Sequence, residues 1–494
     1  MSASERAPLE FDVLVIGSGP AGQKAAVQAA KAGKRAVILE REREIGGACV
    51  HQGTIPSKSL REQALRRSVV AEFKLGVPEG SAQPNLTEVP MPDLLASVGD
   101  IVAAHDRYMT AQLARNGIQT LRGRARFLDS SLVELQAIDG TRQQVTAPRT
   151  IICSGSRPRA PDGIPVDHEH VLDSDSLLSM AWLPNSLLVL GGGVIACEYT
   201  SIFATLGCRV LQADRTARPL TFMDAELVDY YLQHLNSHNS EYLPDMRVRS
   251  VRYDAARAKV RSEFADDRVI ETDKLFLALG RVANVEQLDL AAAGVTLTPA
   301  GHVAVDENLQ TSAAGIYAAG DVIGPPALAS AAMEQGRRAA CHALGIAVAN
   351  ELLGASPLPS GIYTIPEMST VGLDEATARQ SHGDVIVGRA RFGEIARGQI
   401  SGAPRGMLKL VSDALGRKVL GVQVVGDHAT ELVHIGQMAL IGAFDVDAFV
   451  DTVFNFPTMA EAYRVAALDI VSQRRVRVGH SSGFVRQRPH SVAN

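Results

Sequence analysis

The chain has 494 residues, of which 46% are hydrophobic and 21% are charged, and its formal net charge is −5. One hydrophobic core rarely extends beyond about 250–300 residues, so this length predicts several domains in an ordinary globular protein. The acidic balance excludes the basic surface that binds nucleic acid, and no apolar run reaches the length of a membrane span. Neither a nucleic acid nor a membrane is therefore expected as a partner.

The cysteines are odd in number and widely scattered, and no two of them have a Cys-x-x-Cys or zinc-like spacing. This pattern favours reduced thiols in a reducing compartment and predicts no metal site. The first ten residues are polar and charged, so no signal peptide is expected. We therefore expect a cytoplasmic location. The five cysteines are Cys49, Cys153, Cys197, Cys208 and Cys341.

The first predicted element is a buried strand over residues 11–16, which form a continuous apolar run. A glycine-rich turn and an Ala-rich helix follow, and a second strand over 35–39 ends at Glu40. This β-α-β pattern is typical of dinucleotide binding, because the glycines let the backbone approach a pyrophosphate and Glu40 can accept from ribose hydroxyls. The nucleotide contacts predicted in this turn come from Gly17, Gly19, Pro20, Ala21 and Gly22.

After helical patterns over 61–71 and 91–116, separated by a predicted surface loop at 76–92, a near copy of the first unit appears. Strands over 186–190 and 209–213 flank a glycine-rich turn and a helix, and the second strand ends at Asp214. The nucleotide contacts predicted in this turn come from Gly191, Gly193, Val194 and Ile195.

The end of this second unit carries both signs of charge. Asp214 would accept from the 2′-hydroxyl of NAD and repel the 2′-phosphate of NADP. Arg215 and Arg218 follow at once and either pair with that phosphate or are solvated loop charges. The preference between NAD and NADP therefore stays open.

The remaining sequence alternates strands and helices. A strand over 273–279 is followed by Gly280, and a strand over 315–319 is closed by Gly320 and Asp321. The later elements are a helix over 327–349, a linker over 356–361, strands over 407–412 and 419–425, and helices over 430–443 and 459–472. The last part predicts an α+β domain, and the basic tail from Arg474 favours disorder over a binding arm.

The segment from Gly46 to Lys58 resembles the redox-active segment of the pyridine nucleotide–disulfide oxidoreductases, such as dihydrolipoamide dehydrogenase and glutathione reductase. Thr54 stands where that family has a second cysteine. A single thiol cannot form the intramolecular disulfide, which excludes dithiol–disulfide exchange through this pair. Cys49 is either a small apolar residue beside the flavin or a catalytic one.

The C-terminal part departs from the family at the matching place. Phe456 occupies the position of a histidine that precedes proline, and a phenyl ring cannot move a proton to a thiol. Glu461 persists, and its simplest interpretation is a charge at a helix N-terminus. The thiol pair and its acid–base partner are thus absent together while the nucleotide motifs remain, which favours a different reaction.

Within that superfamily the chain most resembles the soluble pyridine nucleotide transhydrogenases. The matching stretches are 53–58, 172–176, 320–324, 361–367 and 454–468. The resemblance implies an α/β fold with two Rossmann-like dinucleotide-binding domains, one for FAD and one for NAD(P), and a C-terminal α+β dimerisation domain. The expected boundaries are 1–160 and 289–357 for the two parts of the FAD-binding domain, 161–288 for the NAD(P)-binding domain and 358–474 for the dimerisation domain. The basic tail over 475–494 departs from the family and is expected to be disordered.

The resemblance also implies the site residues. Lys58 and Glu198 should form an ion pair beside the flavin N5 atom, and Asp321 should bind the ribityl chain. The helix that begins near Ala327 should direct its N-terminus at the flavin's pyrimidine ring. Catalytic candidates are Lys58, Glu198 and Cys49. The further residues implied in cofactor binding are Gly47, Ser154, Gly155, Gly280, Gly320, Leu328 and Ala329.

The implied activity is ping-pong hydride transfer from NADPH to NAD⁺ through reduced FAD, with NAD and NADP(H) as substrates. Two alternatives stay open: an NAD(P)H diaphorase or quinone reductase, and a catalytically silent FAD-binding subunit of an assembly. A homodimer or larger homo-oligomer with an interface in the C-terminal domain is implied, and the apolar face of residues 459–470 is compatible with such an interface.

Overall fold

A computed structural model describes residues 7–75, 91–348 and 357–481. Most of the expected loop at 76–92 and the last part of the expected tail, residues 482–494, lie outside this range. Two compact units form, the first from Met1–Pro219 and Leu235–Ala355 and the second from Leu220–His234 and Ser356–Asn494. Both predicted nucleotide-binding domains belong to the first unit, except for residues 220–234 of the second domain. Every helix in the described residues is too short or too polar to cross a membrane.

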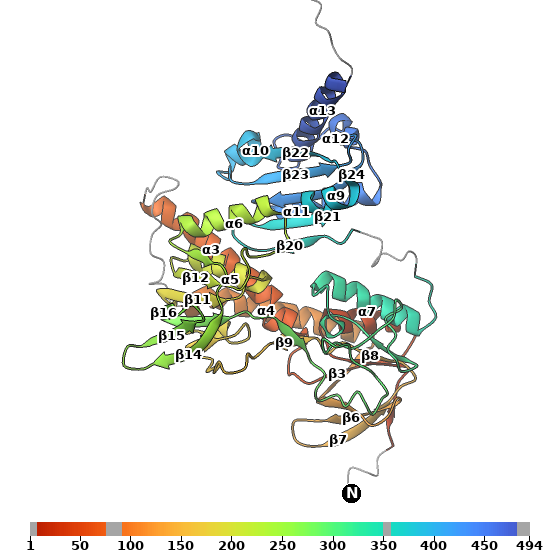
Figure 1. Cartoon of the computed structure of the whole chain (residues 1–494). Coiled ribbons are helices and arrows are strands. Elements are labelled where there is room, and N and C mark those ends of the chain that lie inside the picture. The colour runs from red at the N-terminus through yellow and green to blue at the C-terminus, as the bar shows by residue number, and fades with distance from the viewer. Residues whose placement is uncertain (1–6, 76–90, 349–356, 482–494) are drawn as a thin grey trace, which may run out of the picture. The chain divides into compact units, whose positions relative to one another are not determined.

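The first predicted β-α-β unit lies in a five-stranded parallel sheet. Val13 and Val15 of its central strand face helices α1 and α7, which lie side by side (Figure 1). Leu14 and Ile16 face a second, smaller sheet, so both faces of the strand are buried. In sheet order the strands are β19 (Ile316–Ala318), β8 (Thr150–Ile152), β2 (Val13–Ile16), β3 (Ala36–Glu40) and β4 (Gln119–Arg122), and the helices are α1 (Pro20–Lys31) and α7 (Ala329–Ala343).

The second predicted unit forms another five-stranded parallel sheet, and the strand before its glycine-rich turn again lies at the centre. Leu188 and Leu190 of its central strand pack against a three-stranded antiparallel sheet through Val260 and Phe264. In sheet order the strands are β10 (Val171–Leu172), β17 (Lys274–Leu277), β11 (Ser186–Leu190), β12 (Arg209–Ala213) and β13 (Glu241–Leu243). Helix α5 (Val194–Thr205) and the antiparallel strands β14 (Val248–Asp254), β15 (Lys259–Phe264) and β16 (Val269–Thr272) cover it.

Several further elements complete the first unit. The smaller sheet beside the first parallel sheet comprises β1 (Leu9–Glu10), β7 (Arg142–Thr146), β6 (Leu132–Gln136) and β5 (Arg124–Phe127). A two-stranded ribbon joins β9 (Ser156–Pro158) and β18 (Arg281–Ala283). The remaining helices are α2 (Gly47–His51), α3 (Thr54–Leu75), α4 (Met91–Arg115) and the 3₁₀ turns η2 (Leu177–Ser179) and η3 (Asp321–Ile323).

The second unit is built on a five-stranded antiparallel sheet, which confirms the predicted α+β architecture. Its two central strands are buried along their whole length because helices pack against the sheet. In sheet order the strands are β20 (Ser360–Ile362), β21 (Met368–Gly372), β24 (Val419–Val425), β23 (Met407–Ser412) and β22 (Ile386–Arg391). The helices are α9 (Glu375–His382), η4 (Phe392–Glu394), α10 (Ala396–Ile400), α11 (Ala429–Ile441), α12 (Val446–Asp451) and α13 (Glu461–Ser481).

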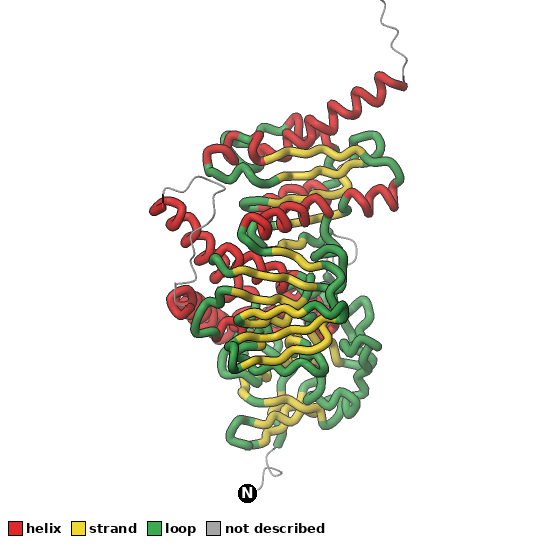
Figure 2. Tube along the Cα trace, turned by 60° about the vertical axis from the view of Figure 1, so that its left-hand side comes forward, coloured by secondary structure: helices red, strands yellow, loops and turns green. Residues whose placement is uncertain are grey.

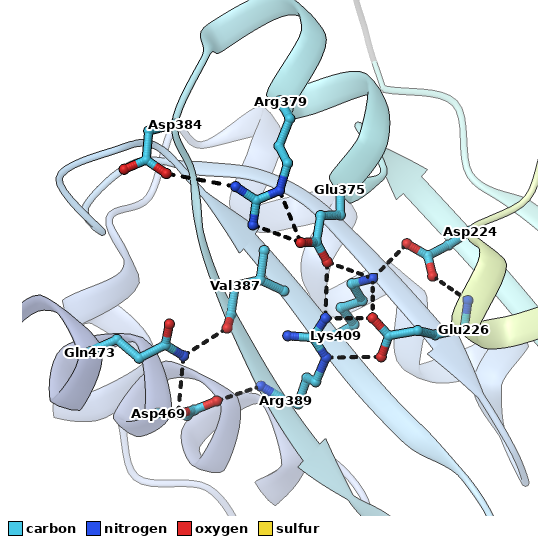
Figure 3. A network of polar contacts seen from close by, with 10 residues as sticks. All are labelled: Asp224, Glu226, Glu375, Arg379, Asp384, Val387, Arg389, Lys409, Asp469 and Gln473. Carbon is cyan, nitrogen blue, oxygen red and sulfur yellow. Dashed lines mark hydrogen bonds and ion pairs between the residues drawn. The ribbon is translucent and has the colours of Figure 1, made fainter.

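Helix α6 (Ala225–Ser237) begins in the second unit, where a cluster of charged side chains fixes its first turn (Figure 3). Lys409 Nζ lies 2.8 Å from Asp224, 2.7 Å from Glu226 and 2.9 Å from Glu375. Arg389 pairs with Glu226 and lies 2.9 Å from Glu375. The Lys409 and Asp224 side chains are only 3% and 4% exposed, so this is a buried ion cluster.

Three expectations for the later elements are wrong in detail. Helix α13 continues to Ser481, so residues 475–481 are helical where a disordered tail was expected (Figure 2). Arg474 pairs with Asp447 at 2.8 Å, which ties this part of the helix to α12. Helix α7 begins at Ala329, two residues later than expected, and ends at Ala343. Part of the expected linker is strand β20.

Candidate functional site

The first glycine-rich turn joins β2 to α1. Gly17 has φ +101°, a conformation that favours glycine, and its N–H donates to Leu39 O at 2.8 Å. A Cβ at Gly22 would collide with Gly17 O, whereas a Cβ at Gly19 would meet nothing within 4 Å. Gly19 caps α1 without any side-chain hydrogen bond. Open space therefore lies over a helix N-terminus whose N–H groups can bind an anion.

The second glycine-rich turn repeats this geometry between β11 and α5. Gly191 has φ +132°, and its N–H donates to Ala213 O at 2.9 Å. Gly193 caps α5 without a side-chain hydrogen bond, and a Cβ there would also meet nothing within 4 Å. Val194 and Ile195 form the first turn of that helix. The unit thus holds two similar cradles for a nucleotide pyrophosphate.

Each cradle has its predicted acid at the end of the neighbouring strand. Glu40 is buried, and its two carboxylate oxygens accept from the N–H groups of Ser18 at 2.8 Å and Glu42 at 2.9 Å. Asp214 accepts from Thr216 through N–H and Oγ1. Each carboxylate oxygen has a second lone pair, so both acids can still accept from a ribose hydroxyl.

Residues after β8 extend the first cradle. Ser154 Oγ is buried and has no hydrogen-bond partner among the described residues, so it is suited to donate to a bound group. A Cβ at Gly155 or at Gly280 would meet nothing within 4 Å. A buried unpaired hydroxyl and open space over two backbone positions fit an extended dinucleotide such as FAD.

Asp321 follows Gly320 at the end of β19, as the sequence predicts. It accepts from Ser156 Oγ at 2.8 Å, and Ser156 Oγ in turn accepts from Arg281 Nε at 2.8 Å. The carboxylate is therefore held in one orientation by a ribbon that the sequence analysis missed. Leu328 caps the N-terminus of α7, whereas Ala327 lies before the cap.

The predicted ion pair between Lys58 and Glu198 is present. Lys58 Nζ lies 2.7 Å from Glu198 Oε2, and the side chains are 27% and 6% exposed. Helix α3 supplies the lysine and α5, which starts at the second cradle, supplies the glutamate. The pair thus joins α3, which begins within the segment from Gly46 to Lys58, to the helix of the second glycine-rich turn. The role of the pair beside the flavin stays a prediction.

Cys49 lies in the short helix α2, which begins at Gly47. Burial raises the pKa of the Cys49 thiol, and the charge of Asp321 acts in the same direction. The Thr54 hydroxyl and the Lys58 charge lower it without cancelling the effect of burial. The thiol is therefore protonated at neutral pH, which disfavours a nucleophilic role.

In the second unit, Phe456 is 68% exposed in the loop before α13. Glu461 is the first residue of α13, and its Oε2 atom is buried without a hydrogen-bond partner among the described residues. The apolar face expected at the dimer interface packs instead on the core of its own unit, because Tyr463, Ala466 and Ile470 are fully buried there.

Four site residues escaped the sequence analysis: Thr216, Tyr242, Ser156 and Arg281. Ser156 and Arg281 reach Asp321 from distant strands. Tyr242 reaches Thr216 across 26 positions, and Thr216 holds Asp214 two residues away. No local spacing in the sequence marks these residues, so only the fold could identify them as neighbours of the predicted acids.

Comparisons with known proteins agree with this geometry. The family model for pyridine nucleotide-disulphide oxidoreductases matches residues 11–336, and the model for the dimerisation domain of the same family matches residues 358–467. A soluble pyridine nucleotide transhydrogenase from Mycobacterium tuberculosis is 41% identical over 94% of this chain and 98% of its own length. One from Ectopseudomonas mendocina is 39% identical over 93% of this chain and 98% of its own.

Solved structures share the fold. LpdA from Mycobacterium tuberculosis is 27% identical, with a TM-score of 0.84 over 92% of this chain and 99% of its own. The HOCl-induced flavoprotein disulfide reductase RclA from Escherichia coli is 23% identical, with a TM-score of 0.83 over 93% of this chain and 99% of its own. This likeness concerns the fold alone. By its paired nucleotide cradles, its two family matches and its full-length relatives, the chain belongs to the pyridine nucleotide-disulphide oxidoreductase family.

Proposed function

We propose that the chain transfers hydride between NADPH and NAD⁺ with FAD as its cofactor and without dithiol chemistry. The observation that carries this proposal is the combination of two equivalent nucleotide cradles with a single cysteine at the redox-like segment. Cys49 contacts Thr54 instead of a second thiol, so reduced FAD would have no disulfide here to which it could pass its electrons. A second nicotinamide nucleotide is then the natural acceptor.

The residues of the first cradle would hold FAD. Gly19 and the N-terminus of α1 would bind its pyrophosphate, Glu40 its adenosine ribose, and Ser154 and Asp321 would bind along its length. Bound FAD supplies a centre that takes hydride from one nicotinamide and gives it to another.

The second cradle would bind NADPH and NAD⁺ in turn. Gly193 and the N-terminus of α5 would bind the pyrophosphate of both nucleotides, and Asp214 the adenosine ribose of NAD⁺. The buried carboxylate of Glu198 holds the Lys58 ammonium group in place, so a fixed positive charge stands at the end of α5 nearest this cradle. The chain's contribution is thus orientation and charge placement.

Steady-state kinetics on the FAD-loaded enzyme test the proposal. NADPH and thio-NAD⁺ should give parallel double-reciprocal lines, because both nucleotides use one cradle in turn. Gly193→Val should lower the rate of this transfer by about a hundredfold or more. The valine side chain fills the space left for a pyrophosphate, so the nucleotide is no longer held in position. Gly99→Val, on the exposed face of α4 with open space around it, is the matched control and should retain transfer.

The outcomes separate the rival activities. Reduction of quinones by NADPH with no transfer to thio-NAD⁺ would replace the proposal by a diaphorase. Failure of anaerobic NADPH to bleach the flavin absorbance would replace it by a non-catalytic FAD-binding subunit.

We also propose that the protein is a homodimer in the cytoplasm. The dimerisation-domain match supports a homo-oligomer, and apolar side chains stand exposed on that unit. Val453 is 89% exposed, and Met438 and Ile441 share one face of α11. All five cysteines are free thiols, which supports a reducing compartment.

A further inference from the structure

Asp214 lies directly over the second glycine-rich turn. A Cβ at Gly192 would stand only 2.8 Å from Asp214 Oδ2, so a glycine is needed for the carboxylate to come this close. The Asp214 backbone is fixed on both sides, because its N–H donates to Leu243 O at 3.2 Å and its carbonyl accepts from Met246 N at 2.8 Å. The carboxylate is thus anchored at the edge of the cradle.

Thr216 holds one oxygen of this carboxylate. Its Oγ1 donates to Asp214 Oδ2 at 2.6 Å and its N–H donates to the same atom at 3.2 Å. A hydroxyl–carboxylate bond of about 2.5–2.7 Å is charge-assisted and strong. In the described residues Asp214 Oδ1 makes no hydrogen bond, so one carboxylate oxygen is held and the other is available.

Tyr242 of β13 holds Thr216 in turn. The Tyr242 hydroxyl donates to Thr216 O at 2.8 Å and lies 3.0 Å from Thr216 Oγ1. Burial and the nearby Asp214 charge raise the pKa of Tyr242 to about 12, so the phenol stays protonated and remains a donor at neutral pH. Tyr242 therefore holds the backbone of Thr216, and the Thr216 side chain in turn holds Asp214.

We propose that Thr216 and Tyr242 are positioning residues that set the preference of the second cradle between NAD(H) and NADP(H). They turn Asp214 so that Oδ1 faces an adenosine ribose, which favours a 2′-hydroxyl and opposes a 2′-phosphate. The inference rests on the proposed function, because it assigns the nucleotide preference of the same site.

The same loop also carries two arginines that could pair with the 2′-phosphate of NADP(H). Arg215 is exposed and follows Asp214 directly, and the Arg218 carbonyl lies 2.8 Å from Thr216 Oγ1. If the Asp214 carboxylate turns away, an arginine can pair with a 2′-phosphate without an opposing charge beside it. Loss of the Thr216 hydroxyl should therefore weaken NAD⁺ and strengthen NADP⁺, which general damage to the fold cannot do.

Isothermal titration calorimetry of the oxidised FAD-loaded enzyme with NAD⁺ and with NADP⁺ tests this inference. Thr216→Val should raise the Kd for NAD⁺ about tenfold and lower the Kd for NADP⁺ about threefold, since a hydrogen bond to a charged group is lost. Tyr242→Phe should shift the ratio of the two Kd values in the same direction by less. Thr216→Ser keeps the hydroxyl and should stay within about twofold of wild type for both nucleotides.

An unchanged Kd ratio in both Thr216→Val and Tyr242→Phe, or an equal weakening of both nucleotides, would overturn the inference. Because this readout is binding, it is independent of the proposed activity. A wild-type enzyme that transfers no hydride while the Kd ratio shifts as expected would reject the transhydrogenation and leave the selectivity assignment standing.

Discussion

Charged residues surround the Cys49 thiol, although the second cysteine of the family is replaced by Thr54. Lys58 acts on the thiol through its charge and pairs with Glu198, whose side chain is nearly buried. The ammonium group therefore has a fixed place, which a flexible surface lysine lacks. An ion pair with one buried partner is worth more than a solvent-exposed one, because solvent screens it less.

Removing the lysine should leave the Glu198 carboxylate buried without its cation. We expect Lys58→Met to lower the thermal unfolding temperature of the FAD-loaded protein, with a loss of about 1–3 kcal/mol. Differential scanning calorimetry measures this, and the double variant Lys58→Met with Glu198→Gln is the control. It should be more stable than Lys58→Met alone, because no charge is left unpaired. Equal unfolding temperatures for wild type and Lys58→Met would contradict the expected coupling.

The sequence alone could predict those site residues that carry a local pattern. The glycines and the acids Glu40 and Asp214 follow fixed spacings within one β-α-β unit, so each can be located without a structure. Thr216 could be seen only as a loop residue. Tyr242 lies 26 positions further on, and nothing in the sequence joins it to Asp214 before β12 and β13 pair.

Among the elements, the start of α6 is tied to the second unit by a cluster of charged side chains. Lys409 stands among Asp224, Glu226 and Glu375, and Arg389 pairs with the last two (Figure 3). The Arg389 hydrogen bond, followed by that of Lys409, lowers the pKa of Glu226 to about 2. Hydrogen bonds to Lys409 likewise lower the pKa of Glu375 against the opposing effect of burial.

Replacing this lysine should be costly. Lys409→Met leaves the buried Asp224 carboxylate and its neighbours without their shared cation, and we expect a loss of about 3–5 kcal/mol in the second unit. Chemical denaturation followed by circular dichroism measures it. Lys418→Met, in the loop before β24, is the matched control and should stay within about 0.5 kcal/mol of wild type. A wild-type denaturation midpoint for Lys409→Met would show that the cluster contributes no net stability.

The same cluster gives a pH dependence with a definite sign. Because the folded pKa of Glu226 lies below its ordinary value of 4.5, its pairing stabilises the fold above that value. This stabilisation should be lost as the pH falls from about 4.5 towards about 2. Denaturation midpoints for Glu226→Gln should therefore change less than those of wild type across this range.

Elements buried on both faces were the ones that the sequence could predict. The bounds of β11, β12, β23 and β24 agree with the predicted strands, because apolar residues make up most of each strand. Strands with one solvent face were missed. Strand β14 has the sequence VRSVRYD, in which arginines separate the few apolar residues, and only pairing with β15 makes it a strand.

At the scale of the whole molecule, the exposed apolar side chains of the second unit predict self-association. We expect wild type to sediment as a dimer, and Val453→Asp or Phe456→Asp to weaken the association by about 2 kcal/mol or more if the residue lies at the centre of the interface. Sedimentation velocity over a range of protein concentrations measures this.

Ile138 of the first unit provides the control, because it is 87% exposed and lies outside the dimerisation-domain match. Ile138→Asp should sediment like wild type. A wild-type protein that remains monomeric at micromolar concentration would contradict the proposed dimer.

The path of the chain into the second unit has a consequence for domain exchange. Segment Leu220–His234 belongs to that unit although it interrupts the sequence of the first, and it carries two of the acids around Lys409. A chimera that receives only residues 356–494 from a relative would combine Lys409 from one parent with Asp224 and Glu226 from the other. A domain exchange preserves the buried cluster only when residues 220–234 and 356–494 both come from the same parent. The second unit must therefore be transferred as two segments.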